Sequence, residues 1–316
     1  MGEIIMSELK YVFGPVPSRR LGRSLGISPI PKKTCNYSCI YCQLGRTNRM
    51  TIERKEFFPL EEILAEFDLY LKNLNGADRF DVVSVVGEGE PTLYSRLGEL
   101  IHGIKERTSK PVAVITNGAL LADPEVRKEL MEADIVLPSM DGCDELIYKK
   151  VDRPHGRIHF EDTIRGLKEF THEFRGQIFM EVMLMDGIND SEECLLKFRD
   201  ALKELHYDKL YINTPVRPPA EANVRVSTPE TIKKATEILG GVSIDALASG
   251  SFFSEISDDY EAILSIIGRH PMNQFEIRGF LDSRSCPDCD SLFKRLAEDP
   301  AVAPTEYKGY ITYRLK

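Results

Sequence analysis

The chain has 316 residues and a net charge of −9, and 42% of its residues are hydrophobic and 29% charged. These proportions exclude a disordered or fibrous chain and are typical of a soluble globular enzyme. No apolar run approaches the roughly 20 residues that a membrane helix needs, and residues 1–10 lack the apolar segment of a signal peptide. We therefore expect a cytoplasmic protein that does not span a membrane.

Positive charge is concentrated near the N-terminus. Between Lys10 and Ile52 there are eight basic residues and no acidic residue. Such a segment attracts an anionic substrate, a nucleic-acid backbone or an acidic redox partner. A solvated basic face, or cations that offset a negatively charged metal cluster, would explain the pattern equally well.

The first motif lies within this basic segment. Residues 34–42 read TCNYSCIYC and place Cys35, Cys39 and Cys42 at the spacing CxxxCxxC. Iron–sulfur clusters normally take four cysteine thiolates, so three on one short loop predict a [4Fe–4S] cluster whose fourth iron is left for another ligand. A zinc site with a distant fourth ligand and a group of buried free cysteines are the alternatives. A disulfide scaffold is not expected, because the cytosol keeps thiols reduced.

Helix and strand patterns alternate along the next part of the chain. Apolar runs bounded by turn residues predict strands at 24–30, 81–87, 111–118, 134–141, 177–185 and 209–216. Amphipathic periods predict helices at 60–74, 94–108, 123–132, 160–174, 190–206 and 228–240. This order predicts an α/β fold, a partial (β/α)6 barrel whose functional residues lie at the C-terminal ends of the strands.

Polar residues follow several of these strands. Residues 87–92 read GEGEPT after the second strand, 116–118 read TNG after the third, and 139–142 read SMDG after the fourth. A glycine lets the backbone approach a ligand closely, and a carboxylate accepts charge-assisted hydrogen bonds from an ammonium group. Capping and turn formation account for such residues about as often as ligand binding does.

Together these motifs resemble the radical S-adenosylmethionine (SAM) superfamily. The resemblance implies that SAM is the ligand of the fourth iron and that Tyr41 packs near its adenine. It implies that Gly89, Glu90 and Pro91 contact the SAM ammonium, with Glu88 standing where glycine is more usual. Further contacts with SAM are implied for Asn117, Ser139, Asp141 and Glu181, together with Met183. Asn213 begins a proline-stiffened segment, 213–219, that could present carbonyl groups to the adenine.

Within the superfamily, residues 11–225 look like the proteins related to the tRNA-wyosine synthases. The similarity is carried by the segments FGPVPSRRLGRSLGISPIPKKTCNYSCIYCQ, VVGEGEPTLY, VITNGALL, VDRPHG and NTPVRPPAE. Those synthases have a second cysteine triplet upstream, whereas no cysteine precedes Cys35 here, so wyosine synthesis itself is not expected. The resemblance favours an anionic substrate, with tRNA as a candidate, and an electron donor such as ferredoxin or flavodoxin. Activation of a glycyl-radical enzyme and modification of a peptide stay open.

The alternation ends near Gly241. We predict three parts: a barrel over 1–240, a connector over 241–257 and a small α+β domain over 258–316. Three helix patterns and a hairpin that turns at Lys308-Gly309 give the last part a winged-helix-like order. An iron–sulfur sensor that binds DNA is therefore the alternative from another functional class. The acidic residues of this part oppose it, because a DNA-binding domain needs a basic face.

Cysteines outside the first motif include Cys143, Cys286 and Cys289. Cys286 and Cys289 form a CxxC with only two thiolates, which favours a structural role or half of a zinc site over a second cluster. Cys143 follows the fourth strand and is expected to be a packed free thiol, with a hydrogen-atom donor in the radical pocket as the alternative.

Overall fold

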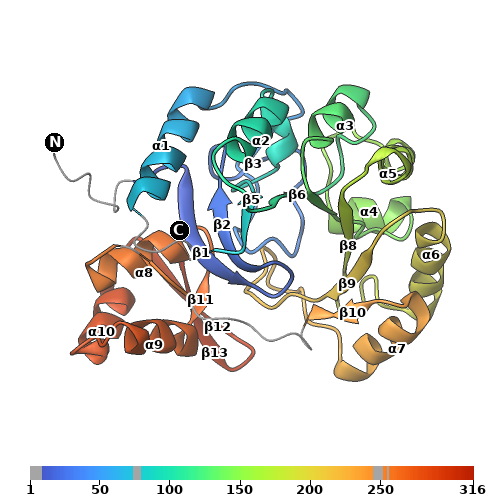
Figure 1. Ribbon diagram of the computed structural model, residues 1–316. Coiled ribbons are helices and arrows are strands. Elements are labelled where there is room, and N and C mark those ends of the chain that lie inside the picture. Colours follow the sequence, from blue (N-terminus) through green and yellow to red (C-terminus); the bar gives the residue numbers. More distant parts are fainter. Residues whose placement is uncertain (1–8, 74–79, 245–251, 255) are drawn as a thin grey trace.

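A mostly parallel sheet forms the centre of the protein. The computed structural model describes residues 9–73, 80–244, 252–254 and 256–316 (Figure 1). Its largest sheet has eight strands in the order β1-β2-β5-β6-β7-β8-β9-β10. Only the β1–β2 pair is antiparallel, and all later neighbours are parallel. The predicted α/β class is confirmed.

All six predicted strands are present and lie side by side in chain order. They are β2 (Gly22–Ile27), β5 (Val82–Val85), β6 (Val112–Thr116), β7 (Ile135–Pro138), β8 (Gln177–Met183) and β9 (Lys209–Asn213). The strands are mostly buried, because helices cover the outer face of the sheet (Figure 1). The prediction missed both edge strands, β1 (Val12–Ser18) and β10 (Val242–Ser243), so the predicted connector begins with a strand. Residues 245–251 and 255 of that connector lie outside the described residues.

Helices connect the parallel strands. The six predicted ones are α1 (Leu60–Asn73), α2 (Leu97–Lys105), α3 (Pro124–Leu130), α5 (Phe160–Glu173), α6 (Glu192–Leu202) and α7 (Pro229–Leu239). A short helix, α4 (Glu145–Val151), and a 3-10 turn, η2 (Pro91–Leu93), were not predicted. Side-chain caps mark several starts, as where Asp123 accepts a hydrogen bond from Glu125 N before α3. None of the helices in the described part of the chain has the length and apolar character needed to cross a membrane.

The C-terminal unit, residues 258–316, has its own small core. It contains α8 (Asp259–Ile267), β11 (Met272–Asn273), α9 (Gln274–Ser283), α10 (Cys289–Glu298), β12 (Val302–Tyr307) and β13 (Tyr310–Leu315). Its core packs against Val16 of β1, and Figure 1 shows the unit beside β1 and α1. Three helices and a hairpin occur in the predicted order, and β11 pairs with β13 in addition. The winged-helix role of the unit stays a prediction.

Candidate functional site

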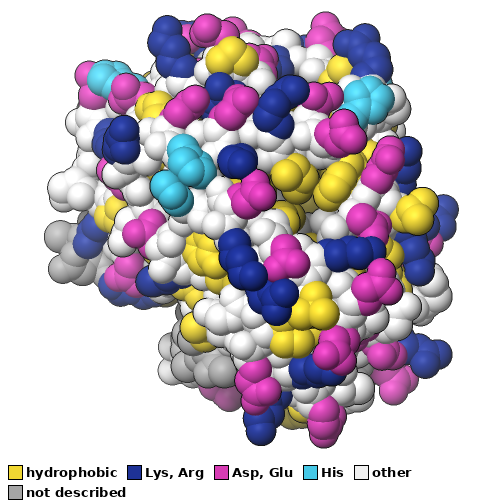
Figure 2. Space-filling view, turned by 90° about the vertical axis from the view of Figure 1, so that its right-hand side faces the viewer, with side chains coloured by type: hydrophobic (Ala, Val, Ile, Leu, Met, Phe, Trp, Pro, Cys, Tyr) yellow, Lys and Arg dark blue, Asp and Glu magenta, His cyan; other side chains and the backbone are white. Residues whose placement is uncertain are grey.

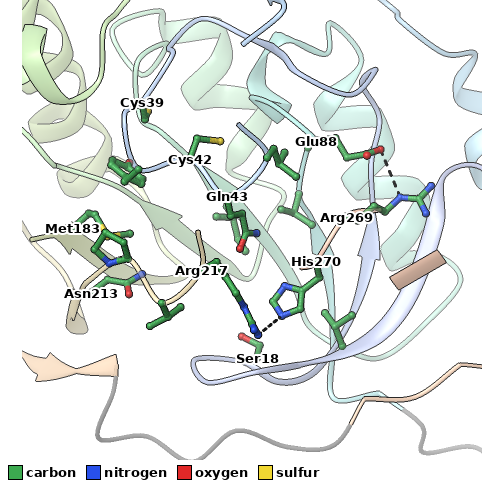
Figure 3. A pocket seen from close by; sticks show the side chains of 18 of the residues that line it. Ser18, Cys39, Cys42, Gln43, Glu88, Met183, Asn213, Arg217, Arg269 and His270 are labelled. Atoms are coloured by element: carbon green, nitrogen blue, oxygen red, sulfur yellow. Dashed lines mark hydrogen bonds and ion pairs between the residues drawn. The ribbon is translucent and has the colours of Figure 1, made fainter. Parts of the chain in front are cut away.

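One large cavity lies at the C-terminal ends of the parallel strands. It has a volume of about 720 Å³, within the size range of small-molecule sites. Glu88 and Glu90 reach it from the end of β5, Asn117 from the end of β6, and Met183 and Asn213 from β8 and β9. Figure 3 shows side chains from both halves of the protein surrounding this space. The barrel topology therefore brings the predicted motifs together, as expected.

The three cysteines of the first motif face this cavity from one loop. This cysteine loop, residues 34–50, begins at β3 (Thr34–Cys35) and ends at β4 (Arg49–Met50), and the two short strands pair in parallel. Cys35, Cys39 and Cys42 all line the cavity. Within the described residues, no group of three or more His, Cys, Asp or Glu side chains is placed to hold one metal ion. A cubane cluster bonds each thiolate to its own iron, so it does not require the sulfurs to share an ion.

The surroundings of the thiols suit a metal cluster. Burial raises the pKa of Cys35 to about 12 and raises the pKa of Cys39 well above its usual range, so without a metal these thiols hold their protons. Binding to iron would have to displace those protons. Asn36 is fully buried, and its Nδ2 has no hydrogen-bond partner. An orphaned donor beside the cysteines fits an acceptor such as a thiolate or sulfide. The residues present therefore fit a [4Fe–4S] cluster.

Gly89 joins the strand-end motif, residues 87–92, to the cysteine loop. A Cβ atom at this position would lie 1.7 Å from Thr34 O, so only glycine allows the contact. On either side of it, Glu90 N donates to Thr34 O at 3.2 Å and Lys33 N donates to Glu88 O at 2.5 Å. Because Cys35 follows Thr34 directly, these contacts fix the distance between the first cysteine and the Glu90 backbone.

Glu90 is held rigidly at the cavity wall. Its Oε1 accepts hydrogen bonds from Thr92 N at 3.0 Å and from the hydroxyls of Thr92 and Thr116 at 2.6 Å, and its Oε2 accepts one from Asn117 N at 2.8 Å. Burial raises the pKa of Glu90, whereas these donors stabilise the ionised form. We regard the carboxylate as ionised, because four donors point at it and the two backbone N–H groups among them, of Thr92 and Asn117, can only donate. Its Oε2 retains a lone pair for a ligand.

Tyr41 lines the cavity, but its hydroxyl points away to Asp141. Tyr41 donates to Asp141 Oδ2, and Met183 N donates to Asp141 Oδ1 at 2.7 Å. Asp141 is buried and does not line the cavity, and its contact with SAM stays a prediction. In this structure Asp141 orients Tyr41 and the end of β8. Burial raises the pKa of Asp141 and of the neighbouring Asp152, which accepts a hydrogen bond from Cys39 Sγ at 3.6 Å.

Glu181 faces the cavity and forms an ion pair. Its carboxylate accepts a hydrogen bond from Arg20 Nη1, from the turn between β1 and β2. The side chain of Glu181 is 9% exposed, and burial of an acidic group is favourable only when the charge is compensated. Part of the basic segment found in the sequence therefore neutralises an acidic residue of the barrel. A contact between Glu181 and SAM stays a prediction.

The C-terminal unit supplies another wall of the cavity. Glu276 accepts two hydrogen bonds from the guanidinium group of Arg217, one of them at 2.7 Å to Nη2. The same Nη2 lies 3.3 Å from His270 Nε2, which must accept because arginine only donates. Burial, followed by the nearby Arg217, lowers the pKa of His270 to about 3, so this histidine is neutral. Figure 3 shows the contact between Arg217 and His270.

A second ion pair connects this wall to the strand-end motif. Arg269 Nε lies 3.6 Å from Glu88 Oε2, and the two side chains are 16% and 17% exposed (Figure 3). Glu88 is the residue at which the sequence departs from the usual glycine of the superfamily. The sequence offered no local signal for Arg269, His270 or Glu276, because they reach the cavity only through packing between distant segments.

Most of the predicted ligand contacts are on the cavity wall. The lining includes the three cysteines and Tyr41, Gly89, Glu90, Asn117, Ser139, Glu181, Met183 and Asn213. Pro91 is not on the wall: it begins η2, and its buried ring fixes the turn after Glu90. Together with Asp141, it acts on the site through its neighbours.

Two of the remaining cysteines are bonded to each other. Cys143 forms a disulfide with Cys194 of α6, with a Cα–Cα distance of 5.6 Å. The prediction of a packed free thiol at Cys143 is wrong, because the loop after β7 and the start of α6 pack together across 51 positions of sequence. Cys286 and Cys289 are free and pack against the core of the C-terminal unit. This favours the structural role for the CxxC pair.

The face of the molecule in Figure 2 shows no concentration of basic side chains like that of the basic segment, residues 10–52. Figure 2 shows acidic and basic side chains intermingled over the visible face. Ion pairs such as Lys197–Asp144 and Lys234–Glu192 bridge elements on the surface, each at 2.7 to 2.9 Å. Such exposed pairs contribute little to stability, and their mixture does not present a surface of one sign.

Comparisons with known proteins agree with this geometry. The Radical SAM superfamily profile matches residues 30–198, just over half of the chain. The UPF0026 protein MJ1312 of Methanocaldococcus jannaschii is 34% identical over 311 residues, which cover 96% of each protein.

Solved structures share the fold of the barrel. TYW1 with a lysine–pyruvate adduct bound has a TM-score of 0.51 and 22% identity, covering 69% of this chain and 72% of that one. The tagged form of anSMEcpe with AdoMet bound has a TM-score of 0.50 and 23% identity, covering 69% of this chain and 57% of that one. At this identity the likeness concerns the fold.

Proposed function

Because the chain belongs to the radical SAM superfamily, we propose that it is an enzyme that cleaves SAM reductively at Cys35, Cys39 and Cys42 and modifies an anionic substrate, with tRNA as the first candidate. One observation carries the proposal: Gly89 packs on Thr34 and so holds Glu90 beside the first cysteine at the wall of a single cavity. Membership of the superfamily implies a [4Fe–4S] cluster and SAM as cofactors.

The protein's own residues bind and orient these groups. The three cysteines would hold the cluster. Glu90 would accept hydrogen bonds from the SAM ammonium with its remaining lone pair, and Asn117 would provide a polar side chain beside it. The ring of Tyr41, fixed by Asp141, would lie against the adenine. When bound, the cluster would supply the electron for reductive cleavage of the C5′–S bond of SAM, the chemistry by which the enzyme would remove a hydrogen atom from its substrate.

Cations near the cavity support an anionic substrate and an acidic electron donor. Lys33 lines the cavity. Burial lowers the pKa of Lys32, and the nearby charges of Lys33, Arg269 and Arg314 lower it as well. Ion pairs already neutralise Glu88, Glu181 and Glu276, so the remaining positive potential is available to an incoming anion. Ferredoxin or flavodoxin as the donor rests on this same argument.

The test of SAM cleavage is anaerobic reconstitution with iron and sulfide, reduction with dithionite, and chromatographic assay of 5′-deoxyadenosine. We expect the wild-type protein to form it and the Cys35/Cys39/Cys42→Ala variant to form none. Cys286→Ala is the matched control, because that cysteine lies outside the cavity. A fully loaded wild-type cluster that yields no 5′-deoxyadenosine, even with tRNA added, would contradict the proposal.

The substrate class is tested separately by binding of tRNA at several salt concentrations. Phosphate contacts release counterions, so log K should fall linearly with log salt concentration, by about 0.7 to 0.9 for each phosphate neutralised. Affinity that is independent of salt would remove tRNA from consideration without affecting SAM cleavage.

A further inference from the structure

Two aromatic side chains are exposed on the C-terminal unit. Phe275 is 63% exposed and Tyr310 is 43% exposed. Their rings meet edge to face with centroids 5.8 Å apart. Single exposed apolar residues need no explanation, whereas apolar side chains that adjoin one another on the surface form a candidate interaction site. Ile311, 43% exposed, extends the pair along β13.

The aromatic pair lies at the edge of the cavity described above. Tyr310 itself lines the cavity, as do Lys308 at the hairpin turn and Asn273 next to the start of α9. Ile311 N donates a hydrogen bond to Gln274 Oε1, which ties the hairpin to α9 and holds the two rings together. Because Tyr310 lines the cavity and its ring meets that of Phe275, a substrate that enters over Tyr310 also meets Phe275.

The hairpin formed by β12 and β13 also contacts two barrel segments that line the cavity. Tyr307 Oη donates to Pro215 O at 2.7 Å, and Arg314 Nη1 donates to Gln43 O of the cysteine loop at 3.5 Å. A Cβ atom on Gly45 would lie 3.4 Å from Lys33 Nζ and 3.9 Å from Arg314 Nη1. Lysine and arginine from two distant segments thus lie together beside the cysteine loop, and Lys33 and Tyr310 line the same cavity.

Acidic groups near the pair are largely compensated. Glu276, one residue from Phe275, is bound through both oxygens to Arg217. Glu306 stays exposed on the same hairpin, opposite Ile311. The acidic residues that argue against DNA binding, such as Asp288 and Asp290, lie at the start of α10 instead. The cavity is therefore lined by the ring of Tyr310 together with the basic side chains of Lys33 and Lys308.

We propose that Phe275 and Tyr310 stack on an unpaired base of an RNA substrate and guide a loop of that RNA to the cavity. The inference rests on the proposed function, because it names the part of the substrate that the same site receives. Aromatic rings bind unpaired bases by stacking, and nearby cations contact the phosphates. A base inside a duplex offers no free face to a ring, so the site should distinguish a loop from a helix.

The experiment compares two labelled RNAs with equal numbers of phosphates: a hairpin with an unpaired loop and a blunt duplex. Binding to the reconstituted full-length protein is measured by fluorescence anisotropy at one fixed salt concentration. We expect the wild-type protein to bind the RNA hairpin more tightly than the RNA duplex. Phe275→Ala and Tyr310→Ala should each weaken hairpin binding about 5- to 150-fold, the range that corresponds to the stacking of one base. Binding of the duplex should change little.

Two variants separate stacking from other effects. Tyr310→Phe keeps the ring and should bind the hairpin like the wild type. Leu146→Ala removes another exposed apolar side chain, 80% exposed on α4, and should leave both RNAs unaffected. Equal affinity of the wild type for hairpin and duplex, or unchanged hairpin binding in both alanine variants, would overturn the inference. Binding of neither RNA would do so as well and would point to a protein substrate.

The failure of this inference can be told from that of the proposed function. Wild-type protein that forms 5′-deoxyadenosine but shows no preference for the hairpin refutes the stacking site alone. Wild-type protein with a loaded cluster that forms none refutes the proposed reaction, whatever its affinity for RNA.

Discussion

Substitution of Gly89 by alanine tests the contact on which the site depends. The added Cβ atom would lie 1.7 Å from Thr34 O, whereas ordinary contacts begin at 3.4 Å. The strand-end motif and the cysteine loop must therefore move apart by about 1.7 Å. Both elements are backbone at this point, so no side-chain rotation can relieve the overlap.

The expected loss of stability follows from the bonds beside the contact. Overpacking of this kind costs about 1 to 3 kcal/mol. Separation of the loops also weakens the hydrogen bonds from Glu90 N to Thr34 O and from Lys33 N to Glu88 O, each worth about 0.5 to 1.5 kcal/mol. The free energy of unfolding of the cluster-free protein should fall by about 2 to 6 kcal/mol. The same shift moves Glu90 away from Cys35, so SAM binding should weaken too.

Urea denaturation of the cluster-free protein measures the first effect, and equilibrium dialysis with SAM on the reconstituted protein measures the second. Gly156→Ala is the matched control, because a Cβ atom there meets nothing within 4 Å. That variant should stay within about 0.5 kcal/mol of the wild type. If the two variants differ by less than this in stability and bind SAM equally, the contact between Gly89 and Thr34 does not organise the site.

Three further predictions concern buried groups. Glu90→Gln places an amide against Asn117 N–H and loses charge-assisted hydrogen bonds. The free energy of unfolding in urea should therefore fall by about 1.5 to 3 kcal/mol, and the affinity for SAM should weaken. An unchanged affinity for SAM would exclude a contact between SAM and Glu90. Burial raises the pKa of Asp141 from 3.8 to about 7, so the native state holds its proton more tightly and stability declines as pH rises through that window. Asp141→Asn should therefore be more stable than the wild type at about pH 8 and lose this advantage near pH 4, and an advantage that grew in acid would refute the assignment. Cys143→Ser opens a disulfide that closes a loop of about 50 residues, which should lower the melting temperature and cost roughly 3 to 5 kcal/mol; peptide mapping without reductant should detect the link to Cys194 in the wild type, and its absence would refute the bond.

The central strands could be predicted because each is an apolar run buried on both faces. Val82–Val85 and Ile135–Pro138 are entirely buried, as parallel strands between helices usually are. The edge strand β1 could not be recognised, because its sequence VFGPVPS contains a glycine and two prolines and resembles a loop. Proline has no backbone N–H group, so a strand tolerates it only where that group would face no neighbouring strand. This condition holds at the edge of a sheet.

The site could be predicted on the barrel side only. Strand ends of a parallel sheet meet at one edge, so motifs 54 residues apart in sequence, such as Cys35 and Gly89, were expected to be neighbours. The wall from the C-terminal unit follows no such rule. Arg217 and Glu276 are 59 positions apart in different structural units, and only the packing of those units shows that they belong to one cavity.

Glu88 connects these two halves of the site. In the sequence it is a departure from the glycine that the superfamily favours, with no function of its own. In the structure its carboxylate pairs with Arg269 of the C-terminal unit, while its carbonyl accepts a hydrogen bond from Lys33 of the basic segment. Because Gly89 and Glu90 follow it directly, a displacement of the C-terminal unit would be transmitted to the proposed SAM contact through three consecutive residues. Substrate binding at the wall formed by the C-terminal unit and SAM binding at the wall formed by the barrel are therefore expected to influence each other.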